Sequence, residues 1–194
     1  MVIDPVANTT TTFAVATGED KYAGGVLAPN GKIYTIPLSA SNYMVIDPVS
    51  NTTTTFAVST VAGKYAGGVL APNGKIYTIP IVASNYMVID PVANTTTTFA
   101  VSTVSVKYLG GVLAPNGKIY AIPRSDANYM VIDPVANTTT TFAVAAGSNK
   151  YANGVLAPNG KIYTIPYDAA NYMVILTDTT IDIDFPLSRL FNKY

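Results

Sequence analysis

The sequence predicts an all-β fold in which four-stranded antiparallel sheets repeat along the chain, as the blades of a β-propeller do. The first observation is a repeat of 43 residues that runs without insertion through this chain of 194. One methionine marks the same point of each repeat: Met1, Met44, Met87, Met130 and Met173. The second observation is composition, because the repeats are filled with Thr, Val, Ile, Tyr, Gly and Pro and keep no helical period. The third is that each repeat holds four short strand candidates, and repeats of about 40 to 50 residues with several strands are typical of propeller blades.

The first two strand candidates of a repeat, residues 67–71 and 75–79, flank the turn Pro72-Asn73-Gly74. Proline is preset for the second position of a type I turn, asparagine suits the third, and glycine takes the left-handed residue of a bulged hairpin. This turn is the strongest local signal in the sequence. It begins at four equivalent prolines: Pro29, Pro72, Pro115 and Pro158.

The other two strand candidates, residues 86–89 and 95–101, are joined by the segment Asp-Pro-Val-Ala-Asn at residues 90–94. Aspartate can accept hydrogen bonds from the backbone that follows it, proline ends the strand ladder, and asparagine tolerates left-handed geometry. We name the four strands of a repeat A to D, starting at residue 67. The connections are then A–B and C–D hairpins, and longer B–C and D–A segments.

These motifs resemble those of known propeller families. The run PNGKIY resembles the PDGK-type hairpin of YVTN and NHL-like propellers, and IDPVANT resembles their ID-x-x-x-N-T turn. The run GGVLAPNGKIY is similar to kelch-type blades through its paired glycines. The resemblance covers residues 1 to about 175 and implies the propeller fold. It implies no particular activity, because propellers carry many unrelated functions.

The repeat predicts a half-blade of strands C and D, four blades and a short tail. Their ranges are residues 1–15, 16–58, 59–101, 102–144, 145–187 and 188–194. The last C–D segment is diverged, but Phe185 lies as far from Met173 as Phe13 lies from Met1. The predicted strand has an apolar face and a charged face, formed by Ile181, Ile183 and Phe185 and by Asp182 and Asp184. Such a strand is typical of a cap protected against further pairing. A β-solenoid is the alternative fold, although its coils are usually shorter and lack these tight hairpins.

The N-terminal half-blade has no A and B strands of its own, and three interpretations are open. Four blades could close a ring in which the half-blade is redundant. The half-blade could instead complete a blade with strands of another copy, which would give an oligomer or a head-to-tail filament. The chain could also start at an internal methionine of a longer array. The second interpretation predicts an assembly edge at Met1, Val2, Ile3 and Asp4.

Composition limits the chemistry that the chain can perform. It has no His and no Cys, which excludes Ser-His and Cys-His catalysis and the usual zinc and copper ligands. One Asp recurs in each repeat (Asp4, Asp47, Asp90 and Asp133), and capping of the Asp-Pro turn explains it better than a ring of carboxylates around a cation. We therefore expect no enzyme activity, no cofactor and no metal.

Charge and hydropathy limit the partners. Charged residues make up 11% of the chain and the formal net charge is zero. A neutral, charge-poor surface favours association of copies, and no Lys/Arg cluster could follow a phosphate backbone. No apolar run reaches the roughly 20 residues of a membrane span, and no signal peptide is predicted. The compartment cannot be inferred, because the chain has no Cys.

Two features point to candidate binding residues. The D–A and B–C connections differ between repeats whereas the rest is nearly constant, and variable loops on a constant scaffold are usual places for binding specificity. The B–C segments RSDA and YDAA contribute Arg124, Asp126, Tyr167 and Asp168. A tyrosine precedes each A strand near these loops, namely Tyr22, Tyr65, Tyr108 and Tyr151. Repeated aromatics would suit a multivalent glycan-binding protein, although packing is the simpler interpretation.

Lysines recur at two positions of each repeat, and both sets are expected to be solvated turn charges. They are Lys32, Lys75, Lys118 and Lys161 after the A–B turn, and Lys21, Lys64, Lys107 and Lys150 before the tyrosine. The sequence as a whole predicts a non-catalytic structural or protein-binding propeller that self-assembles through its half-blade. The alternative is a carbohydrate-binding propeller lectin.

Overall fold

The computed structural model describes residues 1–177, and all regular structure in this part of the chain is β-strand. Within these residues no helix exists that could cross a membrane. The predicted cap strand around Phe185 and the tail at 188–194 lie outside the described residues.

The described strands fall into two compact units. Unit 1 comprises Met1–Leu70 and Gly74–Thr103, and unit 2 comprises Ala71–Asn73 and the chain from Val104 onward. The strands of unit 1 are β1 (Val2–Asp4), β2 (Thr9–Thr11), β3 (Tyr22–Leu27), β4 (Ile33–Pro37), β5 (Asn42–Asp47), β6 (Thr52–Ala57), β7 (Tyr65–Leu70), β8 (Ile76–Pro80), β9 (Asn85–Asp90) and β10 (Thr95–Ala100). Those of unit 2 are β11 (Tyr108–Leu113), β12 (Ile119–Pro123), β13 (Asn128–Asp133), β14 (Thr138–Ala143), β15 (Tyr151–Leu156), β16 (Ile162–Pro166) and β17 (Val174–Ile175).

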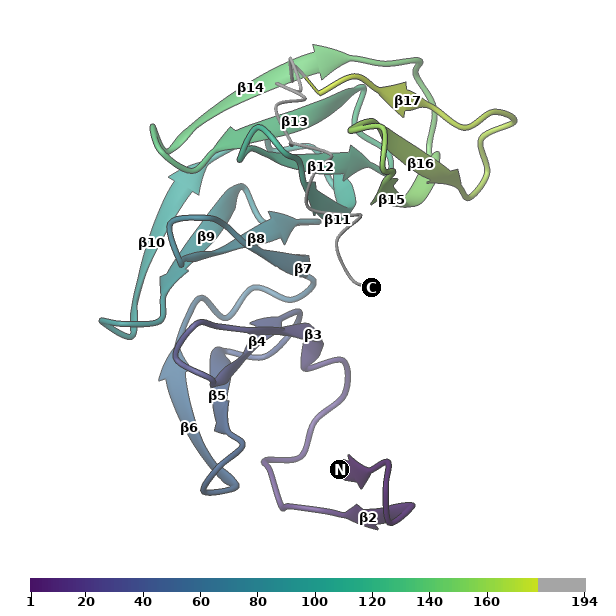
Figure 1. The fold of residues 1–194 in the computed structure, drawn as a ribbon. Helices are drawn as coiled ribbons and strands as arrows, with labels where there is room; N and C mark the ends of the chain where they lie inside the picture. Colours follow the sequence, from purple (N-terminus) through teal and green to yellow (C-terminus); the bar gives the residue numbers. More distant parts are fainter. Residues whose placement is uncertain (178–194) are drawn as a thin grey trace, which may run out of the picture. The chain divides into compact units, whose positions relative to one another are not determined.

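Each sheet is an antiparallel meander, as the propeller prediction requires (Figure 1). Unit 1 holds the hairpin β1–β2 and two four-stranded sheets, β3-β4-β5-β6 and β7-β8-β9-β10. Unit 2 holds the four-stranded sheet β11-β12-β13-β14 and the three-stranded sheet β15-β16-β17. The A strands begin two residues before the predicted start, because Tyr65 already pairs with Pro80 across a β-bulge.

The A–B hairpins have the geometry that Pro-Asn-Gly predicts. Gly31 has φ of 77° and its N–H donates to the Ala28 carbonyl at 3.0 Å. The Ala28 N–H donates in turn to the Lys32 carbonyl at 2.9 Å, which closes the bulged hairpin. The Asn30 side-chain oxygen accepts the Lys32 N–H at 3.1 Å.

The C–D turns also follow the prediction. The Asp47 carboxylate accepts the N–H groups of Val49 and Ser50 at 2.9 and 3.2 Å. These two bonds, and then the bond from Lys32, hold the pKa of Asp47 below its usual value. Asn51 has φ of 54°, a left-handed conformation that Asn tolerates. Capping of the turn therefore explains the repeated aspartate.

Tyrosines dominate the core of unit 1. Tyr34 and Tyr43 are buried, and their rings lie 6.3 Å apart. The Tyr43 ring stacks in turn on Phe56 at 5.0 Å, so the B, C and D strands share one aromatic ladder. Apolar residues of the neighbouring sheet, including Met87 and Ile89, join the same cluster. Of the mid-strand tyrosines, Tyr34, Tyr77 and Tyr120 are buried core residues, as predicted, and Tyr163 is partly buried.

Polar side chains tie the two sheets of unit 1 together at the end that carries the A–B and C–D turns. Asn30 Nδ2 donates to the Pro91 carbonyl at 3.0 Å. The Tyr34 hydroxyl donates to the same carbonyl at 3.0 Å and lies 3.1 Å from Asn94 Oδ1. The A–B turn of one blade thus contacts the C–D turn of the next blade.

Candidate functional site

The variable connections of each sheet lie at one end of it, because the strands run antiparallel and these connections join the same strand ends. We call this end the variable-loop end. It consists of the D–A segments 16–21, 59–64, 102–107 and 145–150 and the B–C segments 38–41, 81–84, 124–127 and 167–170.

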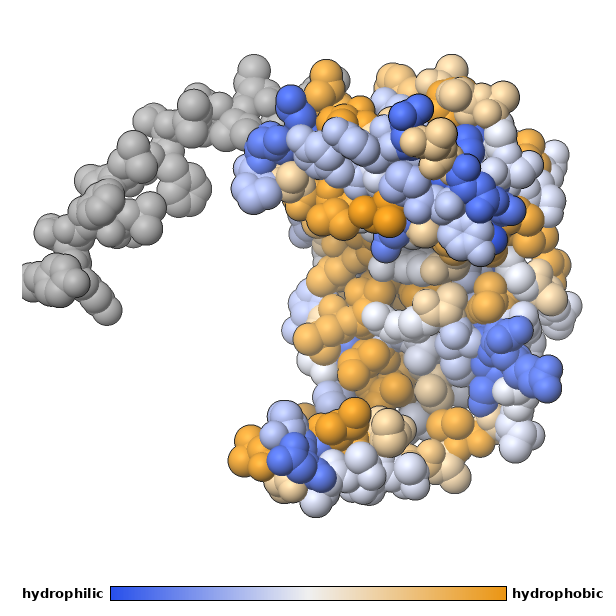
Figure 2. Space-filling model, turned by 90° about the vertical axis from the view of Figure 1, so that its right-hand side faces the viewer, coloured by the Kyte–Doolittle hydropathy of each residue, from blue (hydrophilic) through white to orange (hydrophobic). Residues whose placement is uncertain are grey.

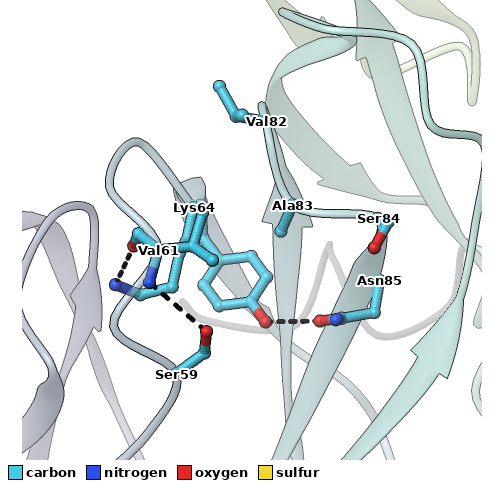
Figure 3. A pocket seen from close by; sticks show the side chains of 8 residues that line it. Ser59, Val61, Lys64, Val82, Ala83, Ser84 and Asn85 are labelled. Carbon is cyan, nitrogen blue, oxygen red and sulfur yellow. Dashed lines mark hydrogen bonds between the residues drawn. The ribbon is translucent and has the colours of Figure 1, made fainter.

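In unit 1 a cavity of about 170 Å³ opens between the two variable segments of the second blade (Figure 3). Its lining residues are Ser59, Val61, Lys64, Tyr65, Val82, Ala83, Ser84 and Asn85. The Tyr65 hydroxyl donates to Asn85 Oδ1 at 2.6 Å, and the Val61 N–H donates to Ser59 Oγ at 3.3 Å. The cavity is small, and hydroxyl and amide groups are its main polar features.

Unit 2 has a cavity at the same position of its last blade, of about 270 Å³. It is lined by Ala145, Ala146, Gly147, Ser148, Lys150, Tyr151, Asp168, Ala169, Ala170 and Asn171. Two of the predicted binding residues, Tyr151 and Asp168, therefore line one cavity. Asp168 is exposed, whereas Tyr151 is buried.

Three of the four lysines that precede the A strands are buried and Lys21 is partly buried, so the prediction that this set is solvated was wrong. Lys64 is 1% exposed and Lys107 is 0% exposed, and Lys150 is buried as well. Lys64 Nζ donates to the carbonyls of Val61 and Ala40 at 2.6 and 2.7 Å. Ala40 belongs to the preceding blade, so this ammonium joins two neighbouring blades. Burial lowers the pKa of Lys64.

The same arrangement occurs in unit 2. Lys150 Nζ donates to the carbonyls of Asp126 and Gly147 at 2.5 and 3.2 Å. Lys107 Nζ donates to the Val104 carbonyl at 2.7 Å. Burial lowers the pKa of both lysines, and the nearby Asp126 carboxylate opposes that effect. A signal in the sequence could have revealed this role: the lysine stays constant while the residues before it vary.

Unit 2 gathers further predicted binding residues around Asp126, which is buried. Asp126 Oδ1 accepts the N–H of Asn128 at 2.9 Å. Burial raises the pKa of Tyr108, and the negative charge of the nearby Asp126 carboxylate raises it further. The other three repeats have alanine at this position, namely Ala40, Ala83 and Ala169. The sequence marked Asp126 as variable but did not show that it is buried among lysines.

Arg124 and Tyr167 form a second contact between the two blades of unit 2. The Arg124 guanidinium lies over the Tyr167 ring at 5.3 Å, and Arg124 Nε donates to Asn149 Oδ1 at 3.0 Å. Tyr167 is exposed. The structure thus brings Tyr108, Arg124, Asp126, Tyr151, Tyr167 and Asp168 to the variable-loop end of unit 2, with Tyr22 and Tyr65 at that of unit 1.

The tyrosines before the A strands serve mainly in packing. Tyr65, Tyr108 and Tyr151 are buried, and Tyr22 is partly buried. The Tyr22 hydroxyl bonds to Asn42 Oδ1 at 2.6 Å, the same bond that Tyr65 makes to Asn85. Burial raises the pKa of Tyr65 to about 12.

The predicted assembly edge lies in hairpin β1–β2, where all residues of both strands are exposed. Met1, Val2 and Ile3 are 77%, 50% and 61% exposed. Among the described residues β1 pairs with β2 alone. One edge of β1 thus carries no strand in this part of the chain.

Comparison with known proteins shows the fold. The chain superposes on virginiamycin B lyase from Staphylococcus aureus with a TM-score of 0.65 and 13% identity, over 84% of this chain and 58% of that one. It superposes on the extracellular domain of BT4673 from B. thetaiotaomicron with a TM-score of 0.61 and 13% identity, over 77% and 20%. The fold is that of a β-propeller. At these identities the likeness shows the fold alone.

An auxiliary nutrient binding protein from Bacteroides ovatus is also similar, with a TM-score of 0.56 and 19% identity over 76% of this chain and 36% of that one. This propeller chain spans less than two thirds of the length of each of these proteins. No protein-family model and no curated protein sequence matches it.

Proposed function

We propose that this β-propeller is a non-catalytic structural or protein-binding module that associates with further copies of itself through hairpin β1–β2. The main observation behind the proposal is that one sequence occurs in two environments. The run MVIDPV at residues 1–6 is repeated at residues 44–49. Met44 and Val45 are 8% and 6% exposed, whereas Met1 and Val2 lie in solvent.

The difference in exposure comes from the neighbouring B strand. In unit 1, β5 pairs on one side with β4, which sets Val45 opposite Tyr34 and Ile46 opposite Ile33. Strand β1 has the same side chains without such a neighbour. Unpaired strand edges recruit additional strands through backbone hydrogen bonds, and apolar side chains on the edge strengthen this pairing.

The surface composition supports self-association as well. Figure 2 shows one face on which apolar residues (orange) lie among a few groups of hydrophilic ones (blue). With a formal net charge of zero, copies of the chain repel one another weakly.

The mass of the protein in solution tests this proposal. We expect the wild-type chain to exceed the 20.4 kDa of a monomer. The substitution Ile3→Lys should return it to monomer mass, because an ammonium would have to enter an apolar strand interface.

Val6→Lys is the matched control, because Val6 lies in the same hairpin and the equivalent Val49, Val92 and Val135 are as exposed as Val6 is. Its mass should equal that of the wild type. A wild-type monomer at high concentration would refute self-association.

Two observations support the absence of catalysis. The ammonium groups of Lys64 and Lys150 already donate to backbone carbonyls, so they are engaged in structure. The lyase from S. aureus becomes catalytically inactive when one histidine is replaced by alanine, and this chain has no histidine. The propeller likeness therefore supports no transfer of that activity.

The variable-loop end is the second candidate for a binding surface, here for a different protein. The two cavities there are lined largely by residues that differ between repeats. Glycan binding is less favoured, because Tyr65, Tyr108 and Tyr151 are buried and offer no ring face to a sugar. For the repeats themselves we propose kinship with YVTN/NHL-like or kelch-type blades on the turn motifs given above.

A further inference from the structure

We propose that hairpin β1–β2 of one copy docks on strand β16 of a second copy, in the place that β17 occupies. The inference rests on the self-association proposed above and adds the receiving surface. It follows from comparing the last sheet of unit 2 with the complete sheets of both units.

Strand β17 is an incomplete C strand. It has two residues, whereas β5, β9 and β13 each have six, although it pairs with β16 in the same register as β5 pairs with β4 (Figure 1). Tyr172, which precedes it, is 64% exposed, whereas the equivalent Tyr43 and Tyr86 are buried. Among the described residues no D strand completes this sheet.

Strand β16 itself is a normal B strand. Its sequence IYTIP is identical to that of β4 and β8, which both pair with a C strand of sequence NYMVID. Hairpin β1–β2 supplies MVID followed by the normal turn and a Thr-rich strand. In the register of the other sheets, Ile3 would lie opposite Ile162 and Val2 opposite Tyr163. Ile46 and Val45 lie opposite Ile33 and Tyr34 in the same way.

Charge complementarity points to the same pairing. In the three complete blades the lysine before the B strand pairs with the aspartate that ends the C strand. The pairs are Lys32–Asp47 at 3.2 Å, Lys75–Asp90 at 3.0 Å and Lys118–Asp133 at 3.4 Å. Leu176 replaces this aspartate in the last blade, and among residues 1–177 Lys161 forms no ion pair. Asp4 of the hairpin likewise has no lysine partner there, so the docked hairpin would join the two.

The neighbouring blade offers a matching polar contact. Asn73 Nδ2 donates to the Pro134 carbonyl at 3.0 Å, as Asn30 does to Pro91. Asn116 is the equivalent asparagine of the next blade, and its Nδ2 donates to the Tyr120 hydroxyl at 3.0 Å. In the described part of unit 2 it has no C–D turn carbonyl as acceptor. A cavity of about 150 Å³ lies beside it. The Pro5 carbonyl of the docked hairpin would be the corresponding acceptor.

Such an interface is heterologous, because the hairpin of one copy meets a different surface of the next. Heterologous contacts produce a ring when the rotation closes and a filament when it does not. Every copy would then carry one donor hairpin and one acceptor strand.

Cysteine cross-linking tests the register directly, because the chain has no native cysteine. Asp4→Cys and Lys161→Cys are made in separate full-length chains and mixed under oxidising conditions. Positions 4 and 161 would be opposite in the docked sheet, so we expect a disulfide-linked species of twice 20.4 kDa. Asp90→Cys mixed with Lys161→Cys is the matched control, because Asp90 already faces Lys75 in its own sheet. It should stay monomeric on a denaturing gel.

The outcomes separate this inference from the proposed function. If Ile3→Lys abolishes association but positions 4 and 161 do not cross-link, the chain self-associates through another receiving surface and the inference fails. If the wild type is a monomer and no cross-link forms, both fail. A chain that carries both cysteines should form linked multimers. A disulfide within one monomer would instead show that the hairpin docks on its own chain, which would overturn the second-copy proposal.

Discussion

The residue that most shapes the variable-loop end is the lysine before each A strand. A buried ammonium is costly unless charged hydrogen bonds replace its hydration. Lys64 meets this condition with two carbonyl oxygens, one from its own loop and one from the preceding blade. Every buried side-chain nitrogen and oxygen in the described residues has a hydrogen-bond partner. The lysine thus joins two neighbouring blades through hydrogen bonds to their loop carbonyls.

Replacing this ammonium should destabilise the fold. We expect Lys64→Met to lower the free energy of unfolding by about 2–3 kcal/mol, because two carbonyls lose a charged donor. Lys75→Met is the control: Lys75 is exposed and its ion pair with Asp90 is worth at most about 1 kcal/mol. Urea unfolding followed by circular dichroism measures both. Equal losses for the two variants would contradict the structural role of Lys64.

At the scale of residues, the sequence predicted correctly the roles that depend only on neighbouring residues of the chain. Pro-Asn-Gly and Asp-Pro predicted turns that depend on a few neighbouring atoms, and both are confirmed. The burial of Lys64 depends on a carbonyl 24 residues away in another blade, and that of Asp126 on the packing of the same end. A local sequence pattern does not show such distant contacts. A buried lysine that follows a polar loop therefore has the same sequence pattern as a solvated one.

At the scale of elements, the paired glycines of the A strands set how closely neighbouring sheets pack. In unit 1 a Cβ added at Gly68 would lie 2.5 Å from Ile36 Cδ1 and 3.2 Å from Val26 Cγ2. Ile36 is buried in the adjacent blade and cannot easily move. Gly67, one residue earlier, would place a Cβ in open space. The two glycines therefore have different functions.

This difference gives a matched pair of substitutions. We expect Gly68→Ala to destabilise unit 1 by about 1–3 kcal/mol through overpacking. Gly67→Ala should be neutral or stabilising by up to about 1 kcal/mol, because alanine restricts the unfolded chain. Thermal unfolding of the two variants and the wild type measures the effect. A stable Gly68→Ala variant would show that the blades can move apart at this point.

The order of the strands could be predicted from the sequence because the same turn and strand motifs occur four times along the chain. Turn chemistry fixed the hairpins and the mid-strand tyrosines indicated the core. The A strands start early because Tyr65 continues the ladder across a bulge, which strand propensity alone does not predict. The fate of hairpin β1–β2 depends on a partner strand outside its own segment, so sequence pattern left three interpretations open.

For the whole molecule, the many buried tyrosines predict loss of stability at alkaline pH. Burial raises the pKa of Tyr43, Tyr65 and Tyr86 to about 12, from 10.0. Between these values the unfolded chain loses phenolic protons that the folded chain keeps. The stabilisation from these groups is therefore complete below about pH 10 and is lost as the pH rises toward 12.

The buried lysines change the stability of the fold with pH in the opposite direction, and they do so at lower pH than the tyrosines. Their folded pKa values lie below 10.5, so their contribution makes stability rise with pH and ends near pH 10.5. We therefore expect the melting temperature to hold up to about pH 10 and then to fall steeply. Circular dichroism melts from pH 8 to 12 measure this, and Tyr65→Phe should be less stable at pH 8 but show a shallower fall. A melting temperature that is constant to pH 12 would contradict the burial of these phenols.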